Sequence, residues 1–170
     1  MQLRSCNSRA MVGLSPVAYE FPELAGDRDD SNWLIIEGLV RSLSEEWSFR
    51  QPALEVDDIE SIVFWLRNVA DGRVAPSPKD GRGKFDPTLG FVEPNIGFTL
   101  AGQASGISTL RISLWAESAP PSLFVDIEHP NMSYFIELEI DRVGLLTAAT
   151  ELEDEGRKFP ARAASRGVLP

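Results

Sequence analysis

The segment Val56–Asp71 constrains the fold most strongly, because its apolar residues recur at spacings of three and four. Asp57 with Glu60 predicts a helix cap and its reciprocal acid, and Gly72 predicts the left-handed stop that ends a helix. The sequence therefore predicts one amphipathic helix here, with an apolar face that must pack against another element. That face consists of Val56, Ile59, Ile62, Val63, Leu66, Val69 and Ala70.

Strand-like segments precede this helix. Trp33–Val40 is almost continuously apolar, and Trp47 and Phe49 alternate with polar residues after a polar turn, which predicts a hairpin. Val12–Phe21 is rich in β-type residues but contains Pro16, so we expect an edge strand or a strand with a bulge.

More strands follow the helix. Ile96–Leu100, Leu110–Leu114 and Tyr134–Ile140 alternate between apolar and other residues, which is typical of half-buried antiparallel strands. Asp141 is expected to cap a second helix that runs to about Glu155. The fold class predicted is α+β: an antiparallel β-sheet of about six to seven strands with two α-helices packed against it.

With 170 residues, the chain has the length of one domain with its own core. We expect a disordered N-terminal arm over residues 1–10, a single α+β domain over 11–162 and a flexible tail over 163–170, with Met11 as an alternative start of the structured part. No apolar run approaches the ~18 residues of a membrane span, and the N-terminus lacks a secretory apolar segment, so a cytoplasmic location is expected.

The charge distribution is uneven. The chain carries 16 Lys+Arg against 26 Asp+Glu, a net charge of −10. All the acids lie between Glu20 and Glu155, where ten basic residues leave a net −16, and both ends are basic. An acidic body repels phosphate backbones, which argues against direct nucleic-acid binding, and it attracts a basic protein partner. The alternative is that this charge only keeps the domain soluble.

Residues suited to catalysis are scarce. Cys6 and His129 are the only residues of their types, which excludes an internal disulfide and a Cys/His zinc site within the chain. Glu137 and Glu139 share one strand face, and either a carboxylate-dependent hydrolase or a solvated face explains them. Asp27–Asp30 lacks the pattern of a calcium loop. We expect no enzyme, cofactor or metal, and core positions for Trp33, Trp47, Trp65 and Trp115.

Several strings, in this order, resemble the WapI-type immunity protein family of bacterial polymorphic toxin systems. They are DDSNWL (Asp29–Leu34), WSFRQPAL (Trp47–Leu54), IVFWL (Ile62–Leu66), FVEPNIGF (Phe91–Phe98), LRISL (Leu110–Leu114) and KFPAR (Lys158–Arg162), within residues 11–162. The chain departs from the family after Pro120 and Pro121, where SLFVD follows without the expected aromatic residue. The resemblance implies a cytoplasmic protein that binds the toxic C-terminal domain of a secreted toxin, often a nuclease, and blocks it.

The resemblance carries over no contact residue, so candidates come from the residues outside the matching strings. The loop Glu117–Asn131 mixes apolar and acidic side chains, as expected for gripping a basic protein surface, and a partly paired edge strand is the alternative. A second candidate patch is the hairpin tip that precedes Trp47. The predicted partner-binding residues are Glu45, Glu46, Glu117, Leu123, Phe124, Asp126 and Glu128. A structural or self-associating domain is the other non-enzymatic alternative, and the oligomeric state stays open.

Overall fold

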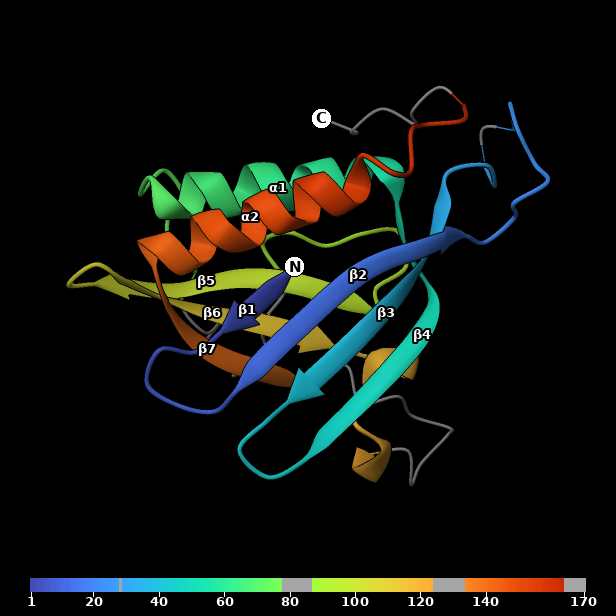
Figure 1. The fold of residues 1–170 in the computed structure, drawn as a ribbon. Coiled ribbons are helices and arrows are strands. Elements are labelled where there is room, and N and C mark those ends of the chain that lie inside the picture. The colour runs from blue at the N-terminus through green and yellow to red at the C-terminus, as the bar shows by residue number, and fades with distance from the viewer. Residues whose placement is uncertain (28, 78–86, 124–133, 164–170) are drawn as a thin grey trace.

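The computed structural model describes residues 1–27, 29–77, 87–123 and 134–163 (Figure 1). The first antiparallel sheet is formed by β1 (Gln2–Arg4), β2 (Met11–Tyr19), β3 (Trp33–Arg41) and β4 (Glu46–Glu55). The second is formed by β5 (Ile96–Ala104), β6 (Ile107–Leu114) and β7 (Phe135–Asp141). The helices are α1 (Val56–Ala70), α2 (Arg142–Gly156) and the short 3₁₀ helices η1 (Ala116–Ser118) and η2 (Pro121–Leu123). The predicted α+β class is confirmed, although the described strands form two sheets instead of one.

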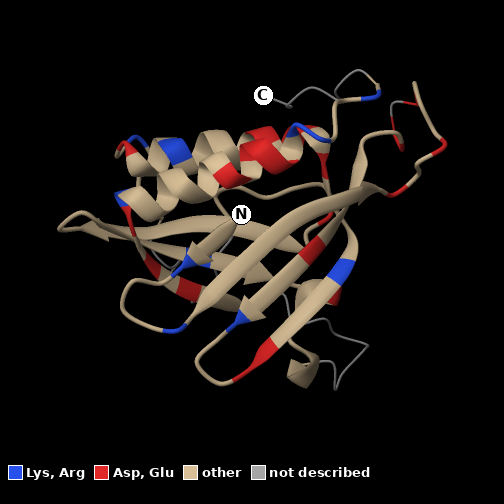
Figure 2. Cartoon of the chain, in the orientation of Figure 1, with Lys and Arg blue, Asp and Glu red and all other residues tan. Residues whose placement is uncertain are grey.

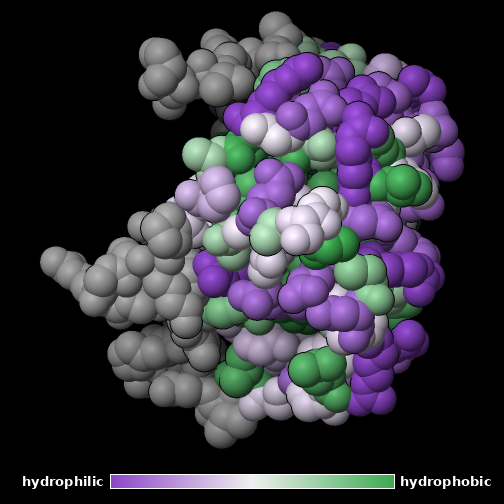
Figure 3. Space-filling view, turned by 90° about the vertical axis from the view of Figure 1, so that its left-hand side faces the viewer, coloured by the Kyte–Doolittle hydropathy of each residue, from purple (hydrophilic) through white to green (hydrophobic). Residues whose placement is uncertain are grey.

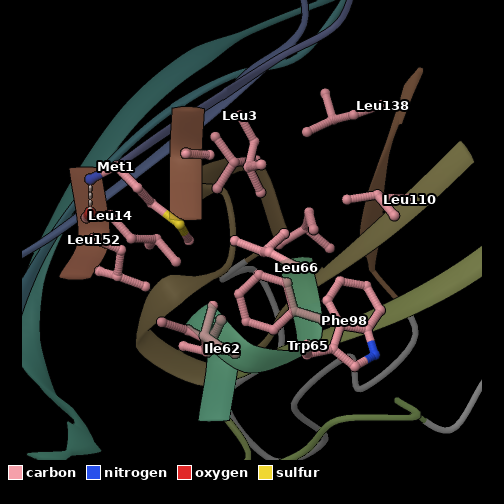
Figure 4. Packing of buried hydrophobic residues seen from close by; sticks show 14 of the residues in the cluster. Met1, Leu3, Leu14, Ile62, Trp65, Leu66, Phe98, Leu110, Leu138 and Leu152 are labelled. Carbon is pink, nitrogen blue, oxygen red and sulfur yellow. Dashed lines mark hydrogen bonds between the residues drawn. The ribbon is translucent and has the colours of Figure 1, made fainter. Parts of the chain in front are cut away.

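The two α-helices lie side by side above the sheets, and one hydrophobic core fills the space that they enclose (Figure 1). Its buried side chains come from every strand and from both α-helices, as Figure 4 shows for the central part. All four tryptophans are at most 9% exposed, which confirms that they pack in the interior. Among the described residues, no helix is long and apolar enough to cross a membrane.

The prediction of a disordered arm over residues 1–10 is wrong for its first part. Leu3 is completely buried on β1, and Met1 packs beside it, with its ammonium group donating a 2.8 Å hydrogen bond to the Leu14 carbonyl oxygen (Figure 4). Beyond β1, the Cys6 N–H donates to the Glu139 carbonyl oxygen at 2.8 Å, which joins the edges of the two sheets. A three-residue strand is too short to show alternation, so only its tertiary partners define it.

Two β-bulges interrupt the pairing of β3 with its two neighbours, at residues 34–36. The register shifts leave Val17 of β2 and Ala53 of β4 without a partner on β3. The expected bulge near Pro16 is thus confirmed. β2 is not an edge strand, because β1 pairs with its first residues. Pro16 lies beyond this pairing, on a stretch of β2 that β1 does not cover, where the missing N–H of proline is tolerated. Bulges redirect side chains at the ends of sheets, and here both lie near the pocket described below.

The two α-helices begin and end close to their predicted limits. The cap of α1 was assigned to the wrong residues: the capping box joins Glu55 and Asp58, and the Glu55 N–H donates to the Asp58 carboxylate at 2.8 Å. Gly72 has a φ of +70°, which confirms it as the stop. At the start of α2, the Asp141 carboxylate accepts from the Gly144 N–H at 2.7 Å, as the sequence predicts.

The segment after α2 returns to the start of β3. The Asn32 side-chain oxygen accepts from the Arg162 N–H at 2.8 Å, and its amide nitrogen donates to the Ala163 carbonyl oxygen at 3.2 Å. Ala163, predicted as the first residue of a flexible tail, is therefore held by hydrogen bonds. The rest of that predicted tail lies outside the described residues.

Candidate functional site: an acidic pocket between the two sheets

A pocket of about 420 Å³ lies where the two sheets approach each other on the side of β4 and η1. The β2–β3 loop and the adjoining strands supply one wall, and the turn before β5 together with η1 supplies the other. Its lining residues are Glu20, Phe21, Asp30, Trp33, Gln51, Pro52, Glu93, Asn95 and Glu117. Segments up to 97 positions apart thus meet at one place, and four of the nine residues are acids, without a basic residue among them.

The four carboxylates of the pocket, those of Glu20, Asp30, Glu93 and Glu117, have no cationic partner. Within the described part of the chain, none of them forms an ion pair or a side-chain hydrogen bond, whereas many acids elsewhere on the surface do. Figure 2 shows acidic residues along the loop between β2 and β3. Burial raises the pKa of Glu20 above its ordinary value, and the charges of Asp30 and Glu93 raise it further.

Uncharged side chains complete the pocket. The Gln51 amide nitrogen donates to the Ser118 hydroxyl oxygen at 2.6 Å, which ties β4 to η1. Asn95 is only 7% exposed, and its side-chain amide has no hydrogen-bond partner among the described residues. Phe21 is 38% exposed, while the Trp33 indole N–H donates to the Asp29 carbonyl oxygen at 3.0 Å. The pocket therefore offers oxygen acceptors and aromatic carbon together.

Local turns hold the two loop walls in place. The Asp27 carboxylate accepts from the N–H groups of Asp29 and Asp30 at 2.9 and 3.0 Å, an Asx turn that positions Asp30. On the other wall, the Trp115 N–H donates to the Asn95 carbonyl oxygen at 2.9 Å. Ala116 has a φ of +46°, a conformation uncommon for a residue with a side chain, immediately before Glu117.

Arg162 contacts the loop that carries two of the pocket residues. Its guanidinium donates to the carbonyl oxygens of Phe21 and Leu24 at 3.2 and 3.1 Å, and it lies 3.9 Å from the centre of the Tyr19 ring. Arg162 thus holds the loop that carries Glu20 and Phe21, and it forms no ion pair with the pocket carboxylates.

The structure brings some of the predicted contact residues together. Glu117 lines the pocket. Glu45 accepts a 2.9 Å hydrogen bond from the Ser122 hydroxyl, so the tip of the β3–β4 hairpin contacts η2. Leu123 is the last residue of η2 and is half-buried. Glu46 forms an ion pair with Arg41 at 2.7 Å, and this hydrogen bond lowers the Glu46 pKa. The predicted residues Phe124, Asp126 and Glu128 lie outside the described residues.

The features considered for catalysis are engaged in other contacts. Glu137 forms an ion pair with Arg111 at 3.1 Å, and Glu139 accepts a 2.6 Å hydrogen bond from the Asn7 amide. In the parts of the chain that the structure describes, no three His, Cys, Asp or Glu residues are arranged to hold a metal ion. His129 lies outside these parts.

Exposed apolar side chains are scattered over separate elements. Leu43, Phe64, Val92 and Val143 are each more than 60% exposed, and they lie on the β3–β4 hairpin, on α1, before β5 and on α2. On the face shown in Figure 3, hydrophobic residues form small groups among hydrophilic ones. Charge, more than a broad apolar patch, distinguishes the described surface.

Sequence reasoning missed most of the pocket. Of its lining residues, only Glu117 was predicted as a contact residue. The sequence signal for the other acids is only that they stand in turn-rich segments, such as Asp27–Asp30. A single sequence does not show that these distant segments meet.

A family model, described as the immunity protein WapI-like family, matches residues 4–160. The chain therefore belongs to the WapI-like immunity protein family, as the resemblance implied, and membership supports an immunity role. Membership of this family implies that the chain binds a toxin partner, and it suggests an inhibitor that is not an enzyme. No match was found among curated proteins or solved structures.

Proposed function

We propose that this protein binds the toxic C-terminal domain of a cognate secreted polymorphic toxin in the bacterial cytoplasm and neutralises it without catalysis. The observation that carries the proposal is a pocket with four carboxylates that have no cationic partner among the described residues. Such a surface is a costly arrangement of like charges for a folded domain, and a basic partner offsets this repulsion.

The toxin domain that suits this surface is a nuclease. A nuclease active site is basic, because it binds the phosphates of a nucleic acid. Carboxylates held at the rim of such a site imitate those phosphates and cover the catalytic groups, so inhibition follows from occlusion. The long-range attraction between the acidic body and a basic toxin also speeds association.

The first experiment is a protection assay with the toxin domain encoded beside the gene of this protein. Cells that express the toxin domain alone should stop growing, and co-expression of this chain should restore growth and yield a complex on purification. Absence of both rescue and complex would remove the proposed function. Rescue with the toxin recovered in chemically altered form would show an enzyme instead of an inhibitor.

A second measurement places the contact surface. Glu117→Lys should slow association about three- to tenfold at low salt, and the difference should shrink at high salt because ions screen the attraction. Glu60→Lys, at an exposed position on α1, is the matched control with the same charge change. Equal association rates for the two variants would exclude Glu117 from the interface. Glu45, Glu46, Leu123, Phe124, Asp126 and Glu128 are proposed contacts to be tested in the same way.

A further inference from the structure

We propose that the acidic pocket receives the guanidinium group of an arginine side chain that the toxin domain presents. This inference rests on the proposed function and adds to it the chemistry of the main anchoring contact. The pocket volume of about 420 Å³ lies at the small end of the range for ligand sites, and it suits one long side chain.

The carboxylates supply the charge. Glu20, Asp30, Glu93 and Glu117 surround the pocket from both walls, and none has a cationic partner within the described residues. They do not converge on one point, since no three of the described acids are placed to hold a metal ion. A guanidinium carries five N–H donors that point in several directions, and it therefore fits dispersed acceptors better than a compact ion does.

Asn95 gives an observation independent of the acids. Its side chain is more than nine-tenths buried and lines the pocket, yet its amide has no hydrogen-bond partner in the described part of the structure. The amide atoms themselves are not fully buried, so a bound group can hydrogen-bond to them in place of water while the rest of the side chain stays packed. A guanidinium N–H supplies the donor that the Asn95 side-chain oxygen lacks.

The aromatic wall favours arginine over lysine. A guanidinium is planar and stacks on aromatic rings, whereas an ammonium group is compact and strongly hydrated. Phe21 and Trp33 line the pocket, and Phe21 is partly exposed. Arg162 already stacks on Tyr19 directly behind this loop, so the fold accommodates the same contact nearby.

The test is an NMR titration of the purified protein with N-acetyl-arginine amide, compared with N-acetyl-lysine amide. The arginine compound should shift the Trp33 indole and the Asn95 and Gln51 amide signals. It should reach half-saturation at a concentration about two- to fivefold lower than the lysine compound. Equal or stronger binding of the lysine compound, or no shift at these groups, would overturn the inference. So would a saturating response to calcium chloride in place of the arginine compound.

Variants separate the pocket from general charge. Glu20→Gln combined with Asp30→Asn should weaken arginine binding about three- to tenfold, whereas Glu60→Gln combined with Glu151→Gln removes the same charge elsewhere and should leave binding unchanged. Phe21→Ala keeps every charge and should abolish the preference for arginine. Equal weakening by the two double variants would contradict a local site.

The two proposals fail in different ways. Because the titration contains no toxin, its result does not depend on toxin neutralisation. A protein that protects cells equally well with the Glu20→Gln and Asp30→Asn pair, and that ignores the arginine compound, retains its proposed function and loses this pocket as the anchor. A protein that binds the arginine compound but forms no complex with the toxin loses the proposed function.

Discussion

Gly38 of β3 lies directly opposite Phe49 of β4, and the Phe49 ring occupies the space where a β-carbon at position 38 would stand. The ring is nearly buried and belongs to the core, so it has little freedom to move aside. The Phe49 ring can pack against β3 at this place because residue 38 has no side chain.

Gly38→Ala should therefore lower the free energy of unfolding by about 1–3 kcal/mol, because the added methyl group displaces the ring. Urea denaturation monitored by tryptophan fluorescence measures the loss. Gly102→Ala is the control, since a β-carbon there meets no atom within 4 Å, and its effect should stay within about 0.5 kcal/mol. Equal losses in both variants would contradict this account.

Leu3 provides a test of β1. Its side chain is fully buried in the common core, so Leu3→Ala should cost about 2–5 kcal/mol of unfolding free energy, through lost burial and the cavity left behind. Gln2→Ala, on the exposed neighbour, should change it by less than about 0.5 kcal/mol. If Leu3→Ala is as stable as the unmodified protein in urea, β1 contributes nothing to the core.

The ion pair between the α-helices predicts a pH effect. The two guanidinium nitrogens of Arg67 donate to the two carboxylate oxygens of Glu153 at 3.2 and 3.0 Å, and this contact lowers the Glu153 pKa below its ordinary value of 4.5. A lowered pKa means that the stabilisation is complete above that ordinary value and is lost as the pH falls through the folded-state pKa.

Glu153→Gln should accordingly lower the melting temperature at pH 7, and the difference from the unmodified protein should shrink towards pH 3. Thermal unfolding monitored by circular dichroism at both pH values measures this. Glu60, on α1, forms no ion pair within the described residues, so Glu60→Gln serves as the control. A difference that stays constant between the two pH values would exclude this ion pair as its cause.

The pH dependence of stability expected from Glu20 has the opposite sign to that expected from Glu153. Burial and two neighbouring acids raise its pKa, so the charged form destabilises the folded state above that pKa, and protonation relieves the penalty as the pH falls. Glu20→Gln should raise the melting temperature at pH 7 and change little at pH 3, while it weakens toxin binding. Glu23→Gln, in the same loop, should leave both unchanged. A Glu20→Gln protein that melts at a lower temperature at pH 7 would show that the Glu20 charge does not destabilise the folded state.

The sequence predicted the elements with strong periodicity and clear caps. The apolar spacing in Val56–Asp71 gave α1 nearly to the residue, and Asp141 gave the start of α2. It misassigned the α1 cap because two adjacent acids, Asp57 and Asp58, fit the same pattern. The division into two sheets and the strand β1 were not predictable, since both depend on contacts between distant segments, such as Cys6 with Glu139.

The candidate site was less predictable than the fold. Glu117 was identified because it stands in a loop that mixes acids and apolar residues, and it lines the pocket. Glu20 and Asp30 stand in the β2–β3 loop, Glu93 stands before β5, and Asn95 is a residue type that is common in turns. They come together around one pocket only when the two sheets approach each other.

The junction of the two sheets has a consequence for the order of folding. Residues 1–6 pair with or contact residues 139–155, through Cys6 to Glu139 and through Met1 to Glu155. β1 can pair with β2 as soon as both have been synthesised. Its contacts with residues 139–155 can form only after well over 100 further residues have emerged. The core that these contacts close therefore becomes complete only after α2 has been synthesised.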